Sequence, residues 1–229
     1  MKVLIACERF GVIRDTFIRA GHDAWSCDLV PTEVPGPHIQ GSALDILDQG
    51  WDLMIAHPDC TYLTVAAAWA LKDPNFEKYP GVGYHMKVKE GTLTGEARRK
   101  AQQDALWFVE QLAKAPIPRI AIENPAVGAI NKNVNLKQYG FASNFPTQII
   151  HPYQFGHDAS KATGLALKNL PKLEHTLFIE PRIVAGKERW ANQTDSGQNR
   201  LSPSTSRAME RAKTYQGWAD AMVSQWGSL

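Results

Sequence analysis

The stretch between residues 51 and 62 constrains the fold most, because a short apolar run there ends abruptly in a proline-bearing turn. The apolar residues 53–56 are followed directly by the turn 57–60, which closes on Cys60. A short apolar run that stops at a tight turn is typical of a buried strand in an α/β fold. Loops at the carboxyl ends of such strands face the crevice in which open α/β sheets bind ligands. The sequence therefore predicts that Cys60 lies at the mouth of a binding crevice.

Short apolar runs and helix-like segments alternate along most of the chain. The runs that predict strands lie at residues 3–7, 24–27, 53–56, 119–122, 147–155 and 182–189. Apolar residues at helical spacing predict helices at residues 11–20, 95–114 and 207–226. The basic residues 98–100 would form a solvated face of the second of these helices. Such alternation predicts an α/β fold with a doubly wound, Rossmann-like parallel sheet.

The expected domain organisation follows from chain length and from two irregular segments. A chain of 229 residues with 44% hydrophobic residues can bury one core, so residues 1–229 are expected to form a single domain. Prolines and glycines interrupt residues 61–94, and loops of this length are typically lids or binding loops, so we expect this segment to be mobile. Residues 165–206 are also irregular and are expected to form a small insert.

Composition argues against several other classes of protein. No stretch of about eighteen apolar residues could span a membrane, and the first residues lack the pattern of a signal peptide. The three cysteines are widely spaced, which favours free thiols in a reducing cytoplasm over a disulfide framework. A net charge of +2 is too small to indicate a polyanion partner by itself. We expect a cytoplasmic protein with no membrane contact and no obligate protein partner.

The histidine and cysteines around the 57–60 turn do not predict a metal site. His57, Cys60, Cys7 and Cys27 lack the close Cys-x-x-Cys or His-x-x-x-His pairs of zinc sites. The zinc nucleobase deaminases need a second cysteine three residues after the first, and the chain has none after Cys60. No metal is therefore expected.

Polar side chains follow three of the predicted strands at the point where each strand ends. Asp28 ends the second run, Cys60 follows the third, and Glu123 and Asn124 follow the fourth. Because carboxyl ends of parallel strands meet at one edge of a sheet, these side chains are expected to face one crevice. An acid at the second strand end suits the ribose hydroxyls of a nucleoside-bearing cofactor. An unpaired buried carboxylate is costly, which favours a function for Glu123. A solvated turn for Asp28 and a small core residue for Cys60 are the alternatives.

The order of these motifs resembles that of the cytosine-C5 DNA methyltransferases. The matching stretches are an opening strand and loop, Ala20-Gly21-His22 before the strand that ends at Asp28, Gly41 through Asp45, Pro58-Asp59-Cys60, and Glu123-Asn124-Pro125. In that family the last two loops read Pro-Pro-Cys and Glu-Asn-Val. The resemblance covers roughly residues 1–130 and is strongest to the short stand-alone members found in bacteriophages.

The resemblance implies a class I S-adenosylmethionine-dependent methyltransferase sheet and S-adenosylmethionine as cofactor. It implies DNA, or a cytosine nucleotide, as the partner, in the host cytoplasm if the protein is phage-encoded. The implied cofactor contacts are Cys7, Arg9, Gly11, Asp28, Asp45 and Pro58. The implied catalytic positions are Cys60, Glu123, Asn124 and Lys161.

In the mechanism that the resemblance implies, the Cys60 thiolate adds to C6 of cytosine, which makes C5 nucleophilic toward the methyl group of the cofactor. Glu123 would hydrogen-bond or protonate ring N3, which requires a carboxyl with a raised pKa. Asn124 would either bind the exocyclic amine or fix the loop. The Cys60 thiol would need a lowered pKa, supplied by backbone amides or by positive charge, with His57 as one source.

Three departures from the family pattern leave other functions open. Arg9 stands where the family has a close-approach glycine. The family's Arg-x-Arg motif is absent, and Lys161 is the nearest basic substitute. Residues 165–206 stand in place of a large target-recognition domain, so base-specific reading of a duplex is not assured. A pyrimidine-nucleotide C5-modifying enzyme and a catalytically degenerate nucleic-acid-binding module of the same fold are therefore alternatives.

Overall fold

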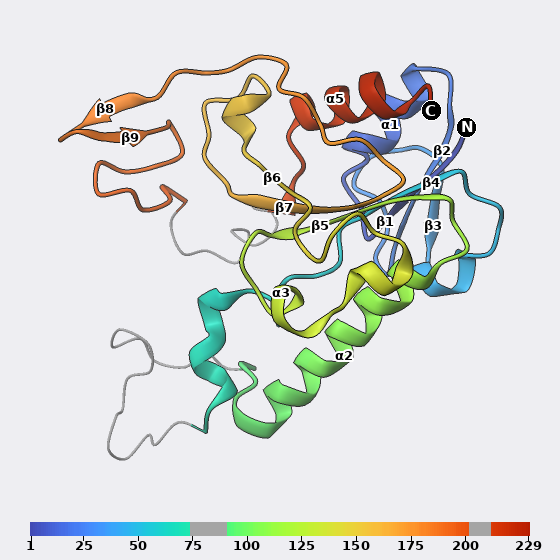
Figure 1. Ribbon diagram of the computed structural model, residues 1–229, viewed down its shortest axis with the longest axis horizontal. Coiled ribbons are helices and arrows are strands. Elements are labelled where there is room, and N and C mark those ends of the chain that lie inside the picture. The colour runs from blue at the N-terminus through green and yellow to red at the C-terminus, as the bar shows by residue number, and fades with distance from the viewer. Residues whose placement is uncertain (74–90, 202–211) are drawn as a thin grey trace.

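One mixed sheet organises the protein. The computed structural model describes residues 1–73, 91–201 and 212–229. Within them, seven strands form a sheet in the order β3-β2-β1-β4-β5-β7-β6 (Figure 1). Their bounds are β1 Lys2–Ala6, β2 Asp23–Asp28, β3 His38–Gln40, β4 Leu53–Ala56, β5 Arg119–Pro125, β6 Gln148–Ile150 and β7 Thr163–Lys168. The first five run parallel, whereas β7 is antiparallel to both β5 and β6.

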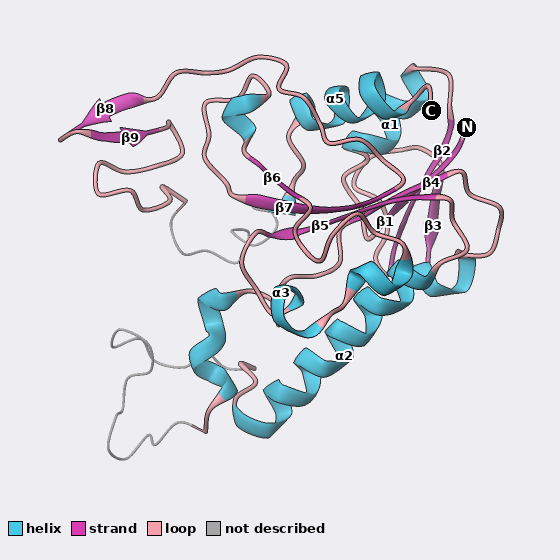
Figure 2. Ribbon diagram, in the orientation of Figure 1, coloured by secondary structure: helices cyan, strands magenta, loops and turns pink. Residues whose placement is uncertain are grey.

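Helices cover both faces of this sheet (Figure 2). The α-helices are α1 Val12–Arg19, α2 Gly95–Lys114, α3 Ile130–Asn133 and α5 Gln216–Trp226, and the 3₁₀ helices are η1 Ala43–Ile46, η2 Val65–Leu71, η3 Leu136–Tyr139 and η4 Pro152–Gln154. Helices α1 and α5 lie on one face and α2 on the other (Figure 1). None of the described helices has both the length and the apolarity that crossing a membrane requires.

Strand β1 shows how the sheet separates two apolar cores. Val3 and Ile5 pack in a core with α1 and α5, whereas Leu4 and Ala6 pack in the core beneath α2. Successive side chains of a strand point to opposite faces, so a strand covered on both faces must be apolar at every position. This is why the central strands are continuous apolar runs in the sequence. The predicted fold class is confirmed as α/β with a Rossmann-like sheet, in which β7 is antiparallel to its neighbours.

The carboxyl-terminal half departs from the predicted elements. The run at residues 147–155 forms only the short strand β6, because η4 begins at Pro152, which has no N–H for a strand ladder. Residues 182–189 form a hairpin, β8 Arg182–Val184 and β9 Lys187–Arg189. Its turn consists of Ala185 and Gly186, with φ of 48° and 75°, which is the backbone that a tight hairpin needs.

Several other boundaries also differ. Strands β3 and β7 were not predicted, and β7 places residues 165–168 inside the sheet, so the irregular segment begins after Lys168. Part of the loop expected at 61–94 is the 3₁₀ helix η2, and residues 74–90 lie outside the described residues. The last helix, expected at 207–226, is α5 and begins at Gln216, while residues 202–211 lie outside the described residues.

Candidate active site

The ends of β4 and β5 bring the two predicted catalytic motifs together. These strands pair in parallel, with Ala56 opposite Ile122, so the turn that follows β4 lies beside Glu123 and Asn124. The loop after β1 leaves the same edge of the sheet. Strand order changes direction between β1 and β4, which is the position at which open α/β sheets bind ligands.

The turn at residues 57–60, called the thiol turn below, is held by hydrogen bonds to residues on both sides of Cys60. Asn124 is buried and its Nδ2 donates to the Pro58 carbonyl over 2.9 Å. The backbone N–H and the hydroxyl of Thr61 donate to Asp59 Oδ1 over 3.0 and 2.8 Å. Cys60 is left exposed at the turn. Of the two roles considered for Asn124, the described contacts are those of a residue that fixes the loop.

Side chains of helix α2 hydrogen-bond the residues that follow this turn, a contact that the sequence did not indicate. Arg98 Nη2 donates to the Thr61 carbonyl over 3.0 Å, and its guanidinium lies 5.2 Å from the Tyr62 ring centroid. Gln102 Nε2 donates to the Tyr62 carbonyl over 2.8 Å. The interpretation of residues 98–100 as a solvated face is therefore wrong for Arg98, which is buried. Helical periodicity assigns a charged residue to solvent unless its partner is known, and here the partner is a distant backbone carbonyl.

Cys60 is mainly a thiol in the free protein. The protein partly desolvates its sulfur, and the negative charges of Asp59 and Glu123 add to this effect, so the pKa of Cys60 is raised. Lys161 opposes the shift. The expected lowering of the Cys60 pKa is thus wrong for the free protein, and His57 contacts Glu123 rather than the thiol.

Glu123 has the opposite balance of charges. Burial acts to raise its pKa, but the charge of Lys161 and the hydrogen bond from His57 outweigh it, so the pKa of Glu123 is lowered. The contact joins His57 Nδ1 to Glu123 Oε2 at 3.3 Å. The raised pKa that ring activation requires is therefore absent in the free protein. Lys161 acts on both Cys60 and Glu123, so the structure brings the four predicted catalytic positions together.

The loop after β1 carries the predicted cofactor contacts of the amino terminus. Cys7 has a left-handed backbone with φ of 59°, which turns the chain sharply at the end of β1. Burial raises the pKa of Cys7, and the charges of Asp28, Cys27 and Asp59 raise it further. Because Asp59 belongs to the thiol turn and acts on Cys7, the loop after β1 lies next to that turn. Pro58, in that turn, is buried.

Gly11 caps the start of helix α1 and could not be replaced without strain. Its φ is 71°, and a Cβ there would lie 2.5 Å from Arg14 Nη2. Arg14 itself is fully buried. It donates to Ser26 Oγ, to Thr32 Oγ1 and to the carbonyls of Val34 and Pro35, at 3.1 to 3.4 Å. The connection between β2 and β3 is thus built around the Arg14 guanidinium.

The remaining cofactor candidates lie around the same connection. Asp28 ends β2, is partly exposed, and accepts a hydrogen bond from the Val30 N–H over 3.2 Å. Asp45 lies in η1 and contributes, after burial and Asp28, to raising the pKa of Cys27 to about 11. Arg9 pairs with Glu33, and the Arg9 carbonyl accepts from Glu33 N and Thr32 Oγ1.

Among these residues, Asp28 fits a nucleoside-bearing cofactor best. Asp28 presents a carboxylate at the carboxyl end of β2, beside the place where the strand order reverses. A carboxylate there can accept hydrogen bonds from ribose hydroxyls. Arg9, in the loop after β1, forms an ion pair with Glu33. Among the described residues, no cluster of three or more His, Cys, Asp or Glu side chains could hold a metal ion.

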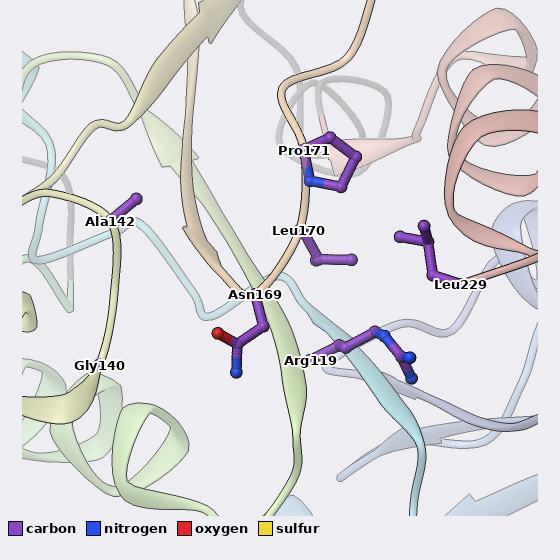
Figure 3. A pocket seen from close by; sticks show the side chains of 7 residues that line it. All are labelled: Arg119, Gly140, Ala142, Asn169, Leu170, Pro171 and Leu229. Carbon is purple, nitrogen blue, oxygen red and sulfur yellow. The ribbon is translucent and has the colours of Figure 1, made fainter.

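A surface hollow elsewhere does not belong to this site. It is lined by Arg119, Gly140, Ala142, Asn169, Leu170, Pro171 and Leu229 (Figure 3). Arg119 begins β5 and Asn169 follows β7, which runs in the opposite direction. The hollow therefore lies at the amino-terminal edge of the parallel strands, away from Cys60 and Glu123.

Comparisons with known proteins place few limits on the function. No protein-family model matches the chain, and no curated protein matches it. One similar solved structure is an Escherichia coli protein described as a DNA modification methyltransferase encoded within a prophage. The two share 11% sequence identity and a TM-score of 0.42, over 72% of this chain and 45% of that one. The chain thus spans less than half of that protein's length, and the function is argued below from the geometry of the site.

Proposed function

We propose that the protein is an S-adenosylmethionine-dependent methyltransferase that acts on C5 of cytosine in DNA. The observation that carries the proposal is the convergence of Cys60, Glu123, Asn124 and Lys161 at the carboxyl ends of β4 and β5. A thiol beside a buried carboxyl is the pair needed to attack a pyrimidine ring at one atom while polarising it at another. The sheet that carries this pair is of the class I methyltransferase type.

Each side chain has a defined part in the proposed reaction. The Cys60 sulfur forms a bond to C6, and the electron pair of the C5–C6 double bond becomes available at C5. Glu123 gives a proton or a hydrogen bond to N3, which draws electrons from C6. When bound, S-adenosylmethionine would supply an electrophilic methyl group to C5, and its sulfur would leave as the thioether of S-adenosylhomocysteine. A base then removes the C5 proton, the C5–C6 double bond forms again, and the bond between sulfur and C6 breaks. Asn124 keeps the thiol turn in position through Pro58.

The proposed scheme requires one proton to leave the Cys60 sulfur, where the free protein holds it. In the free protein the thiol of Cys60 holds its proton, because its pKa is raised, while Glu123 is ionised, because its pKa is lowered. The reactive form needs the reverse, a thiolate and a protonated carboxyl. Transfer of one proton from sulfur to Glu123, or to N3, leaves the total charge unchanged. Lys161 stabilises whichever of the two groups is the anion.

The test is whether DNA gains 5-methylcytosine. We expect the protein, incubated with labelled S-adenosylmethionine and DNA, to produce 5-methylcytosine that the Cys60→Ala variant does not produce. DNA that contains 5-fluorocytosine should form a covalent adduct with Cys60. A base can remove hydrogen from C5 as a proton but cannot remove fluorine, so the sulfur remains bound to C6. Label on another base, or equal activity of the Cys60→Ala variant, would contradict the proposal.

A free pyrimidine nucleotide is the second candidate substrate. The observation that favours it is the small size of the described lobe after β7, which holds only the β8–β9 hairpin as regular structure before α5. Specific DNA binding takes roughly 1,000 Å² or more of protein surface, whereas a free nucleotide needs only the crevice. Activity on dCMP or dCTP with none on DNA would favour this candidate.

A non-catalytic binding module of the same fold is the third candidate, favoured by the Arg9–Glu33 pair beside the proposed cofactor position. Calorimetry with S-adenosylmethionine separates it from the first two. Salt-sensitive DNA affinity without cofactor binding would support the module. For each candidate we propose a cytoplasmic setting, in the host cell if the protein is phage-encoded.

A further inference from the structure

His57 follows β4 and interacts with two acids, one after β1 and one in β5, the two strands that flank β4. Its backbone N–H donates to the Ala6 carbonyl over 3.0 Å, which ties the end of β4 to the end of β1. Its Nδ1 lies 3.3 Å from Glu123 Oε2, and the two side chains are only 14% and 16% exposed. Because the Glu123 pKa is lowered, the carboxylate is the acceptor and Nδ1–H is the donor.

Glu8 is the second acid that interacts with His57. Glu8 is 4% exposed, and its Oε1 accepts from the Ile13 N–H at the start of α1 over 3.0 Å. Within residues 1–73, 91–201 and 212–229, Glu8 Oε2 and His57 Nε2 are both buried and have no hydrogen-bond partner. Burial raises the pKa of Glu8, and His57 is the strongest of the charges that oppose this. Each of these two side chains thus keeps one buried polar atom without a hydrogen-bond partner.

We propose that His57 is a positioning residue for Glu123, hydrogen-bonded to it through Nδ1, and that its unpaired Nε2 interacts with Glu8. This rests on the proposed function of Glu123. A protonated imidazole is the side chain that donates in two opposed directions, so it can hold both carboxylates at once. With Oε2 taken by His57, the other oxygen of Glu123 is the one available to N3 of the ring. The start of α1, next to the proposed cofactor position, is thereby connected to the acid that activates the base.

Other charged groups act on the same pair of acids and must be kept constant in a test. Lys161 faces Glu123 from the loop before β7, and Arg14 faces Glu8 from α1. Cys60 lies in the same turn as His57, with its charge coupled to that of Glu123. A role of Glu8 in helix capping alone uses only Oε1 and leaves the second buried oxygen without a reason.

Two substitutions separate the two sides of the imidazole. The amide nitrogen of Asn reaches the place of Nδ1, whereas that of Gln reaches the place of Nε2. We expect ¹³C NMR of labelled glutamate to show the Glu123 carboxyl titrating at higher pH in both variants, because each removes the positive charge, with the larger shift in His57→Gln. We also expect kcat to fall by about tenfold in His57→Asn and by about a hundredfold in His57→Gln, with KM for DNA unchanged, as expected when positioning alone is lost. His22→Gln, at a histidine in the turn after α1, is the matched control.

The carboxyl titration does not depend on methyltransferase activity, so it separates this inference from the proposed function. A shifted Glu123 titration in a protein that never methylates cytosine would uphold the connection and reject the function. An unchanged Glu123 titration in both folded variants, confirmed by unaltered circular dichroism, would overturn the connection. Glu8→Gln is the second route: it should shift the Glu123 titration less than either His57 variant, and no shift in His57→Gln together with a shift in Glu8→Gln would also overturn it.

Discussion

Cys60 and Cys7 follow neighbouring strands of the same sheet, and their surroundings make them different. Cys60 is exposed in a turn supported by Asn124, and Lys161 is near enough to favour its thiolate. Cys7 is half-buried, and burial together with the neighbouring Asp28, Cys27 and Asp59 raises its pKa. The same residue type at the same topological position therefore differs in reactivity because of neighbours that come from elsewhere in the chain.

The largest expected effect separates the two thiols by activity. Cys60→Ala is expected to lower methyl transfer to DNA by about a thousandfold or more, because the attacking atom is lost. Cys7→Ser should leave kcat within about tenfold and act mainly on the KM for S-adenosylmethionine. Steady-state assays with both substrates measure this. An equal loss of kcat in the two variants would remove the distinction between the cysteines.

Lys161 tests the cause of the difference. Lys161→Met should raise the pKa of Cys60 further, because the positive charge that opposes the shift is gone, and methyl transfer should fall by about a hundredfold. Alkylation of Cys60 by iodoacetamide at a fixed, mildly alkaline pH should slow, while alkylation of Cys7 should not change. Lys172→Met, at an exposed lysine after β7, is the control. Unchanged alkylation of Cys60 in Lys161→Met would show that its charge does not act on the thiol.

The two arginines that support the two loops sharpen the comparison further. Arg14→Met should cost about 2 kcal/mol of the free energy of unfolding, because its four acceptors lose their donor, and should weaken S-adenosylmethionine binding. Arg98→Met should instead change the alkylation rate of Cys60. Urea unfolding and calorimetry measure these effects, with Arg19→Met at the end of α1 as a control. A loss of cofactor affinity in Arg98→Met equal to that in Arg14→Met would mean that the loops are not supported separately.

The smallest expected effects concern the two acids and the dependence of stability on pH. The pKa of Glu123 is lowered, so it adds stability above its unfolded-state pKa, and this is lost as pH falls through the folded value. The pKa of Glu8 is raised, so its contribution is present below the unfolded-state pKa and is lost as pH rises through the folded value. From acid to neutral pH, Glu123→Gln should therefore gain less stability than the unaltered protein, and Glu8→Gln should gain more. Urea unfolding at a series of pH values checks the signs, and equal slopes in the two variants would contradict them.

The parts of the fold that could be predicted are those in which burial acts on consecutive residues. Strands β1, β4 and β5 are apolar at nearly every position because both faces of the sheet are covered, so their ends, and hence Cys60 and Glu123, were located from the sequence. Strands β3 and β7 were missed because one is a three-residue edge strand and the other follows a polar loop. The single strand predicted at 182–189 became a hairpin because Ala185 adopts a left-handed backbone that residue type alone does not indicate.

In the candidate site, the sequence by itself determined which polar side chains stand at strand ends, since that follows from local hydrophobic patterning and from the rule that parallel strands share one edge. The tertiary structure alone decided their charge states. Lys161 lies about a hundred residues after Cys60 in the chain, yet its charge reaches both Cys60 and Glu123, and Arg14 and Arg98 are buried against backbone carbonyls of distant loops. Hydrogen bonding and Coulomb interactions depend on distance in space, so the partner that sets a pKa cannot be found from the residue that carries it.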